Sequence, residues 1–190
     1  MSKLEYLLTF LSIIIALGVT DILISLHRML KIRDQIHWHW IPLAWAAILL
    51  MAILNIWFAI HFYLDDRLSE TAGGFVFILL PVIFILLLCM AIFPDQPEKE
   101  EKDLLKWYFK NKNYIFILFI LNWVSFNFMK TFQQIHEAVP FKPEQLTMLI
   151  PIVFYVILIS TRKVWIHSLI TGFYFAMFVL MIMDTRMTLV

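Results

Sequence analysis

A few ionisable side chains interrupt the long apolar runs of this sequence, and they are the first candidates for chemistry. Asp21 lies inside the run 7–26, and Gly18, Asp21, Ser25 and Arg28 recur at spacings of three and four that place them on one helical face. An ionised group costs several kcal/mol inside a bilayer, so such a carboxylate is a functional candidate by default. Two interpretations stay open: a carboxylate that handles protons or cations inside a helix bundle, or a structural partner of Arg28 or of another basic helix end.

Amide and basic side chains mark two further apolar runs. Asn55 lies near the middle of its run, where asparagine commonly forms hydrogen bonds between membrane helices. The run 114–132 is the most polar and carries Asn122, Asn127 and Lys130. Asn127 and Lys130 share a helical face that could line a hydrated path, although a lysine at this place can also extend to the membrane surface.

Histidines are the third kind of candidate. His167 and Thr171 lie one turn apart in the last apolar run, His27 is expected at a similar depth, and His61 and His136 fall near the opposite surface. Two facing histidines can ligate a haem iron or a divalent metal. These histidines lie at the ends of the runs beside loops, so we predict no metal site and no cofactor. A haem or metal redox protein stays as the weaker alternative.

Several protein classes lack their signatures. There is no G-x-S-x-G, no glycine-rich phosphate loop and no H-E-x-x-H, and the chain has 4 glycines in all. Cys89 is the single cysteine, which excludes a disulfide within the chain and a thiolate metal cluster. The net charge is +1 and the basic residues are dispersed, unlike the dense basic face that binds nucleic acid. We predict no catalytic residue. An enzymatic role is not excluded, but no residue is assigned to it.

Six apolar segments must position these residues. Hydrophobic residues make up 62% of the 190 and charged residues 15%, whereas ordinary soluble domains are roughly 45–50% apolar. A spanning helix needs about 20 apolar residues, and a barrel strand is much shorter. The sequence therefore predicts an all-α polytopic transmembrane helical bundle, a single domain over 1–190. Its predicted spans are 7–26, 41–62, 74–93, 114–132, 146–160 and 164–183.

The loop between the third and fourth spans carries a second prediction. A charged stretch, 98–103, precedes residues whose spacing gathers Leu104, Leu105, Tyr108 and Phe109 on one face. This pattern predicts a short interfacial helix, although a membrane-anchored linker is the simpler interpretation. A cytoplasmic protein partner could bind there, and the candidate residues for such a contact are Trp107, Tyr108 and Phe109.

The distribution of lysine and arginine predicts the orientation, because cytoplasmic loops carry the excess of these residues. One side of the predicted membrane carries five: Lys3, Arg67, Lys130, Lys142 and Arg186. The other side carries ten: Arg28, Lys31, Arg33, Lys99, Lys102, Lys106, Lys110, Lys112, Arg162 and Lys163. We therefore expect the first, third and fifth loops in the cytoplasm and both termini on the non-cytoplasmic side.

Short motifs resemble a family of bacterial six-span integral membrane proteins to which no activity is assigned. They are E-Y at 5–6, S-I-I at 12–14, L-G-V-T-D-I-L at 17–23, F-P-D at 93–95 and W-Y-F at 107–109. Members of that family often have histidine at the place of Asp21, so chemistry at that position does not carry over. The resemblance implies a bacterial inner-membrane location and no mechanism.

These observations favour a channel- or transporter-like component for ions or small solutes, working in the bilayer as a homo-oligomer. Six spans with short loops leave the membrane interior as the sizeable place for function. The rival hypothesis is a membrane scaffold or signalling partner that acts through the cytoplasmic third loop.

Overall fold

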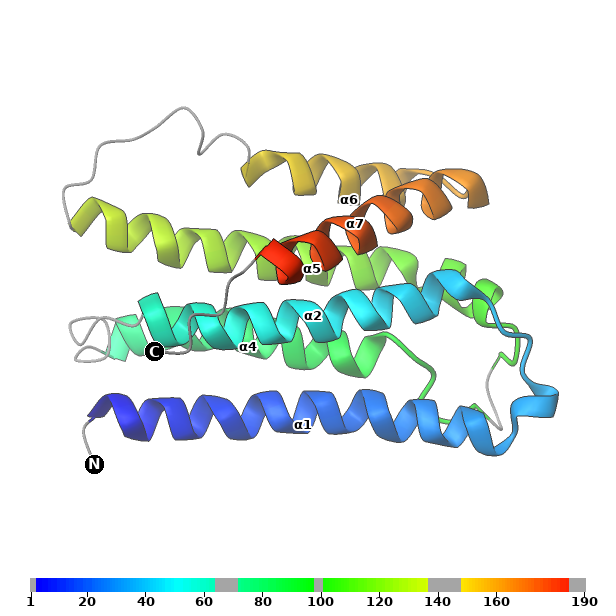
Figure 1. Ribbon diagram of the computed structural model, residues 1–190, viewed down its shortest axis with the longest axis horizontal. Helices are drawn as coiled ribbons and strands as arrows, with labels where there is room; N and C mark the ends of the chain where they lie inside the picture. Colours follow the sequence, from blue (N-terminus) through cyan, green and yellow to red (C-terminus); the bar gives the residue numbers. More distant parts are fainter. Residues whose placement is uncertain (1–2, 64–71, 98–100, 137–147, 185–190) are drawn as a thin grey trace.

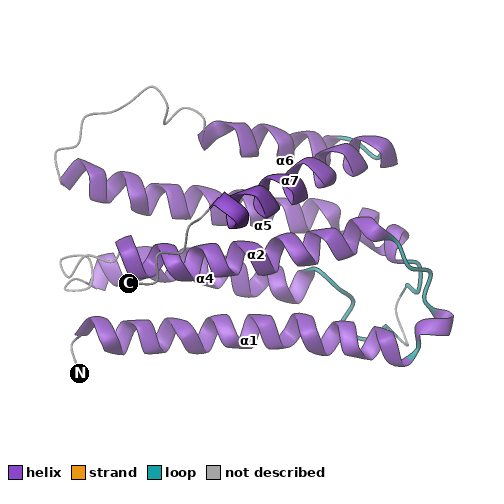
Figure 2. Cartoon of the chain, viewed as in Figure 1, coloured by secondary structure: helices purple, strands orange, loops and turns teal. Residues whose placement is uncertain are grey.

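The protein is all-helical over the residues that its computed structural model describes, which are 3–63, 72–97, 101–136 and 148–184 (Figure 2). No strand occurs within these ranges, although His37 and Asp103 form one isolated β-bridge. A short 3-10 helix, η1 (Arg33–Gln35), follows the first helix. The described α-helices are α1 (Lys3–Lys31), α2 (Trp40–Tyr63), α4 (Ala72–Ala91), α5 (Leu104–His136), α6 (Ile150–Ser160) and α7 (Val164–Asp184).

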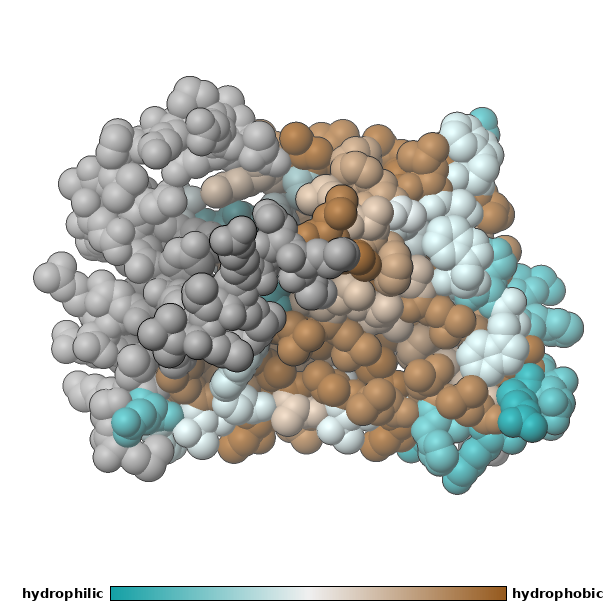
Figure 3. Space-filling view, in the orientation of Figure 1, coloured by the Kyte–Doolittle hydropathy of each residue, from teal (hydrophilic) through white to brown (hydrophobic). Residues whose placement is uncertain are grey.

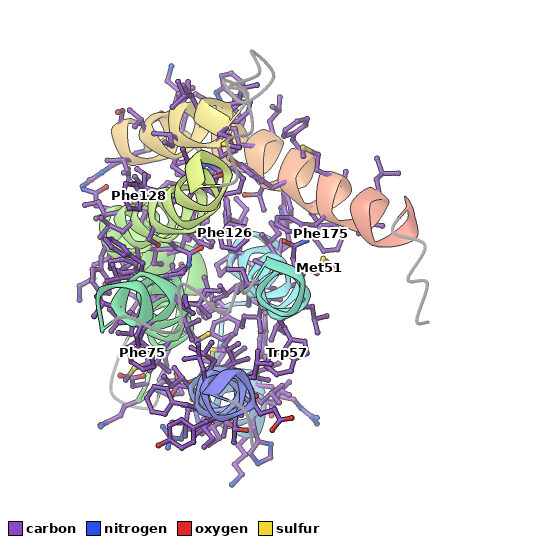
Figure 4. The ribbon with its side chains drawn as sticks, turned by 90° about the vertical axis from the view of Figure 1, so that its left-hand side faces the viewer. Met51, Trp57, Phe75, Phe126, Phe128 and Phe175 are labelled. Carbon is purple, nitrogen blue, oxygen red and sulfur yellow. The ribbon has the colours of Figure 1, made fainter. Side chains whose placement is uncertain are left out.

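The helices form a bundle in which successive members run in alternating directions along the long axis (Figure 1). α4 packs extensively against both α1 and α5, α6 packs on α5, and α7 packs on α2. α2 also contacts α1, α4 and α5, and it lies near the middle of the bundle when viewed end-on (Figure 4). α2, α5, α6 and α7 together form one half of the bundle, and α1 covers α4 on the other side.

Three helices in the described part of the chain are long and apolar enough to cross a membrane. The qualifying stretches are Glu5–Lys31, Trp40–Trp57 and Gly73–Ala91. Ile150–Ser160 and Val164–Leu180 are apolar but shorter. α6 has 11 residues, about 16 Å at 1.5 Å per residue, against a hydrocarbon core of about 30 Å. Pro151 lies in the first turn of α6. A proline is tolerated there because an amide at that position would have no hydrogen-bond partner within the helix.

The outer surface supports a membrane environment. Ile13 and Leu17 on α1 are 56% and 57% exposed, and large apolar side chains on every other α-helix are similarly exposed. Figure 3 shows apolar side chains across the middle of one face, with hydrophilic ones gathered at the end that holds the loops after α1 and before α5. An apolar middle and a polar end are typical of a protein that contacts lipid tails and headgroups.

The structure corrects the prediction of a separate interfacial helix between the third and fourth spans. Leu104 is the first residue of α5, which continues to His136 without interruption and so includes the predicted span 114–132. The amides of Leu105 and Lys106 donate to Asp103 Oδ1 at 3.0 and 3.1 Å, so Asp103 caps the helix. No proline or glycine occurs in 104–136 to end it. The amphipathic residues therefore form the first turns of a long helix.

Backbone and side-chain hydrogen bonds join the two loops at the polar end. The amide of His37 donates to Lys102 O at 2.9 Å, and the amide of Leu104 donates to His37 O at 3.2 Å. Lys102 Nζ donates to Gln35 Oε1 at 2.6 Å. The loop after α1 and the segment before α5 are thus tied together, which fixes where α5 begins.

Close packing between α1 and α4 depends on a glycine. A Cβ atom added to Gly18 would lie 3.0 Å from the side-chain sulfur of Cys89. It would also lie 3.7 Å from a backbone atom of α4, the Cα of Leu86. A small residue at this position lets two membrane-type helices approach closely. This contact attaches α1 to the rest of the bundle.

Candidate functional site

A cavity of about 340 Å³ lies between α2, α5, α6 and α7, and we call it the central cavity. Three amides that the sequence singled out, Asn55, Asn122 and Asn127, converge on it from α2 and α5. The described residues of its lining include no charged side chain. The other residues that line it are Ile48, Leu49, Ala52, Ile56, Phe119, Trp123, Phe126, Pro151, Tyr155, Tyr174, Met177 and Phe178. Such a lining of apolar and aromatic groups with a few amides is typical of small-molecule sites.

Hydrogen bonds orient two of these amides. Asn122 Nδ2 donates to the carbonyl of Pro81 on α4 at 2.8 Å, and Asn127 Nδ2 donates to Trp123 O at 2.8 Å. Trp123 Nε1 donates in turn to Met148 O at 2.7 Å, which holds its ring at the edge of the cavity. Each of these two amides therefore uses one donor on the backbone and keeps its side-chain oxygen as an acceptor.

α5 presents different residues to the two sides. Figure 4 shows Phe126 on the inner side of the helix and Phe128 on its outer side. Phe126 is buried and lines the central cavity, whereas Phe128 is exposed. One helix thus contributes both a cavity wall and an outer apolar surface.

Aromatic rings close the central cavity toward the polar end of the bundle. Trp45 of α2 is 0% exposed, and its ring centroid lies 5.0 Å from Phe116, 5.2 Å from Phe119 and 5.7 Å from Tyr174. Tyr155 and Tyr174 stack with centroids 5.5 Å apart and planes 5° from parallel. We call these five residues the Trp45 cluster. The cluster separates the cavity from a second group of polar side chains.

That second group surrounds the last turn of α6. The final carbonyls of a helix have no partner within the helix, and in a membrane they need one from elsewhere. Lys112 of α5, 3% exposed, donates from Nζ to Leu158 O at 2.9 Å and also to Ile159 O. A cation at a helix C-terminus also interacts favourably with the helix dipole. Lys112 therefore replaces the hydrogen bonds that the end of α6 lacks.

His167 completes this arrangement, which we call the α6 cap. Its ring is 0% exposed, Nδ1 lies 2.7 Å from the hydroxyl of Tyr108, and Nε2 lies 3.1 Å from the carbonyl of Thr161. With Nε2 as the donor to Thr161, Nδ1 accepts from the Tyr108 hydroxyl. Phe109 packs edge-on against the imidazole with centroids 4.8 Å apart. The cap consists of Lys112, His167 and Tyr108, from α5 and α7.

Two buried polar atoms next to these groups have no hydrogen-bond partner within the described residues. They are Trp45 Nε1 and the Thr171 hydroxyl, one turn after His167. A buried polar group without a partner costs about 1–3 kcal/mol, and neither residue lines the central cavity. Thr171, which the sequence singled out, lies beside the cap and outside the lining of the central cavity.

Asp21 lies far from both groups, on the face of α1 toward α4. Its Oδ2 atom is buried without a hydrogen-bond partner in the described part of the chain, and it shares a helical face with Gly18, which contacts Cys89 of α4. Arg28 donates from Nη1 to the backbone carbonyl of Asp95 at 2.8 Å. The structure thus places Arg28 on a loop carbonyl and Asp21 at the α1–α4 contact, and it brings neither to the central cavity.

The four remaining candidates are placed differently from one another. Trp107 and Tyr108 are 7% and 1% exposed, so these side chains pack inside the bundle, whereas Phe109 is half-buried. Lys130 belongs to α5, and its side chain lies outside the described residues. In this arrangement Trp107 and Tyr108 contribute to the core and do not form an exposed surface.

The histidines considered for haem do not form a common site. His27 is exposed, and His167 has both ring nitrogens within hydrogen-bond distance of other groups. The side chains of His61 and His136 lie outside those described. Among the described residues there is no group of three or more histidine, cysteine or acidic side chains placed to hold a metal ion.

Lys112, Trp45 and the Tyr155–Tyr174 pair were missed as site residues by the sequence analysis. Lys112 was counted as a loop lysine, although it shares a helical face with Tyr108 and Phe116 at spacings of four. A lysine on an otherwise aromatic stripe is the signal that could have found it. The tyrosine pair joins α6 to α7 across the bundle, and sequence spacing carries no information about such a contact.

Comparison with known proteins adds no relative. No family model matches the chain, no curated protein matches it, and no solved structure matches its fold. Its function must therefore be argued from its own geometry.

Proposed function

We propose that this chain is a six-span integral membrane protein of the bacterial inner membrane that binds a small uncharged solute in its central cavity, as a transporter-like component. The observation that carries the proposal is the cavity of about 340 Å³, which lies between four helices and is lined by aromatic rings and three amides. Solute sites in membrane proteins commonly lie inside the bundle.

Six spans are supported by the alternating helix directions and by the exposed apolar side chains. The loops that follow Lys31, Ala91 and Ser160 share one end of the bundle, and the excess of basic residues predicts that this end faces the cytoplasm. α6 and α7 are short and apolar, and they pack against α5 and α2. In this orientation both termini are non-cytoplasmic.

The lining selects the class of solute. Aromatic walls favour a flat ring, and amide oxygens accept a hydrogen bond from an N–H or O–H group. A charged ligand would lose its hydration without gaining an opposite charge. An uncharged aromatic molecule with one donor group fits these conditions.

A transporter-like role is favoured over an open pore by the Trp45 cluster. Its rings are packed at centroid distances of 5.0 to 6.3 Å and close one side of the cavity. A conducting channel needs a continuous path, whereas a transporter exposes its site to one side at a time. The cluster is then the barrier that must rearrange.

Equilibrium dialysis of the detergent-purified protein against radiolabelled indole tests the site. We expect saturable binding of indole, and at least about tenfold weaker binding of indole-3-acetate, which has the same ring and a negative charge. Ala52→Phe fills the cavity and should abolish binding, whereas Leu54→Phe, at a position 53% exposed on the same helix, should leave it intact.

Equal uptake of indole by the wild type and by Ala52→Phe would show partition into the micelle and would overturn the proposed site. The oligomeric mass of the same preparation tests the expected homo-oligomer. A haem at His167 would have to break one of two hydrogen bonds, so the redox alternative gains no support from this geometry.

A further inference from the structure

A second hollow lies at the polar end, between the start of α5 and the turn that joins α6 to α7. We call it the basic groove, and its volume is about 550 Å³. Three of its lining residues are cationic, namely Lys106, Lys110 and Arg162, and the described lining includes no acidic residue. The other lining residues are apolar: Leu105, Phe109 and Val164.

The charge of the groove is mostly uncompensated. Lys106 Nζ lies 3.8 Å from Asp103 Oδ2, so that ammonium has a neighbour of opposite charge. Lys110 and Arg162 are exposed, and within the described residues neither side chain forms an ion pair or a hydrogen bond. The buried ammonium of Lys112 lies close enough to Arg162 for the two charges to repel each other. An anion in the groove would relieve this repulsion.

The apolar wall shows which kind of anion fits. Val164 is 40% exposed, and the next residues on α7, Trp165 and Leu169, are 65% and 64% exposed. Exposed apolar side chains of the same helix thus begin directly after the groove, and a tryptophan at a helix end is typical of the headgroup depth. A soluble anion would use only the cationic part, whereas a phospholipid would use both parts.

We propose that the basic groove binds the headgroup phosphate of an anionic phospholipid in the cytoplasmic leaflet, with its acyl chains along α7. Arg162 can hold two phosphate oxygens through its planar guanidinium, and Lys110 provides a point charge. This inference rests on the membrane placement in the proposed function and is independent of solute binding in the central cavity. Basic pockets between spans on the cytoplasmic side commonly bind such headgroups.

The unfolding midpoint of delipidated protein tests the proposal, because a ligand that binds the folded state raises it. The probes are dioctanoyl phosphatidylglycerol, dioctanoyl phosphatidylcholine and inorganic phosphate at equal concentrations. We expect the first to raise the midpoint and the other two to have little effect. In Lys110→Gln/Arg162→Gln the apparent affinity for phosphatidylglycerol should fall at least about tenfold.

Lys31→Gln/Arg33→Gln is the matched control, since it removes two exposed charges from the same end of the bundle. This control should respond to phosphatidylglycerol as the wild type does. If Lys110→Gln/Arg162→Gln fails to fold, the single variants Lys110→Gln and Arg162→Gln take its place. Equal shifts in both double variants, or equal shifts with phosphatidylcholine, would overturn the proposal. A full response to inorganic phosphate would show a free-anion site and would also overturn it. Indole binding by the same samples reports the central cavity separately.

Discussion

The α6 cap and the central cavity lie in the same half of the bundle, yet they use polar side chains in opposite ways. At the cap, Lys112 and His167 are buried and bonded to backbone carbonyls. At the cavity, the amides of Asn122 and Asn127 are half-buried and border an unfilled volume. The Trp45 cluster lies between the two regions.

The difference separates structural polar groups from functional candidates. A short helix such as α6 leaves carbonyls inside the bundle, and the cap satisfies them. The amides of Asn122 and Asn127 each keep an acceptor that the backbone does not need. A buried polar residue in a membrane protein is therefore a site candidate only after its backbone partners have been accounted for.

The largest expected change in the free energy of unfolding comes from disrupting the Trp45 cluster, which lies between the two regions. Trp45→Ala deletes a fully buried ring from the centre of the aromatic cluster and should lower the free energy of unfolding by about 3–5 kcal/mol. Trp165→Ala, at a position 65% exposed, should change it by less than about 0.5 kcal/mol. Unfolding in mixed micelles, followed by circular dichroism, measures both. Similar small losses in the two variants would mean that the cluster is not a packed barrier.

A smaller effect is expected at the cap. Lys112→Met keeps the length of the side chain but leaves the carbonyls of Leu158 and Ile159 without this donor, and it should cost about 2 kcal/mol of unfolding free energy. Lys31→Met, at an exposed position in the last turn of α1 and outside the basic groove, is the matched control and should be nearly neutral. Equal stability of the two variants would remove the structural role assigned to Lys112.

The smallest effect is expected at the cavity. Asn122→Ala loses one hydrogen bond to Pro81 O and should cost about 0.6 kcal/mol, the typical value of a hydrogen bond between membrane helices. The same variant should weaken indole binding, because an acceptor leaves the lining. A loss of stability as large as that of Lys112→Met, with unchanged indole binding, would place Asn122 among the structural groups and erase the contrast between the two regions.

The sequence predicted the helical class and singled out three amides that border the cavity, but it did not predict the cavity or the partners of the polar groups. Asn55, Asn122 and Asn127 stand out because amides are rare in apolar runs, and they do converge. Periodicity could not show that Tyr108 faces inward, since the first turns of α5 present aromatic residues on several faces. The role of Lys112 depends on where α6 ends, which is a tertiary property.

The length of α5 was also beyond the sequence patterns. The charges at 98–103 and the apolar face within 104–109 predicted a surface helix. The structure instead has one helix through both segments, because Asp103 caps its start and no helix breaker follows. A local signal for an interfacial helix is the same as the signal for the polar first turns of a long span.

Thiol labelling of the cavity in intact membranes tests the central claim most directly. In a Cys89→Ala background, a single cysteine replaces Ala52 in the cavity or Leu54 on the outer surface, and a small membrane-impermeant methanethiosulfonate is added to right-side-out or inverted vesicles. The account predicts that Ala52→Cys reacts from one side of the membrane, that indole slows the reaction, and that Leu54→Cys in the lipid does not react. Ala52→Cys that reacts from neither side, or no faster than Leu54→Cys, would contradict a solute site inside the bundle.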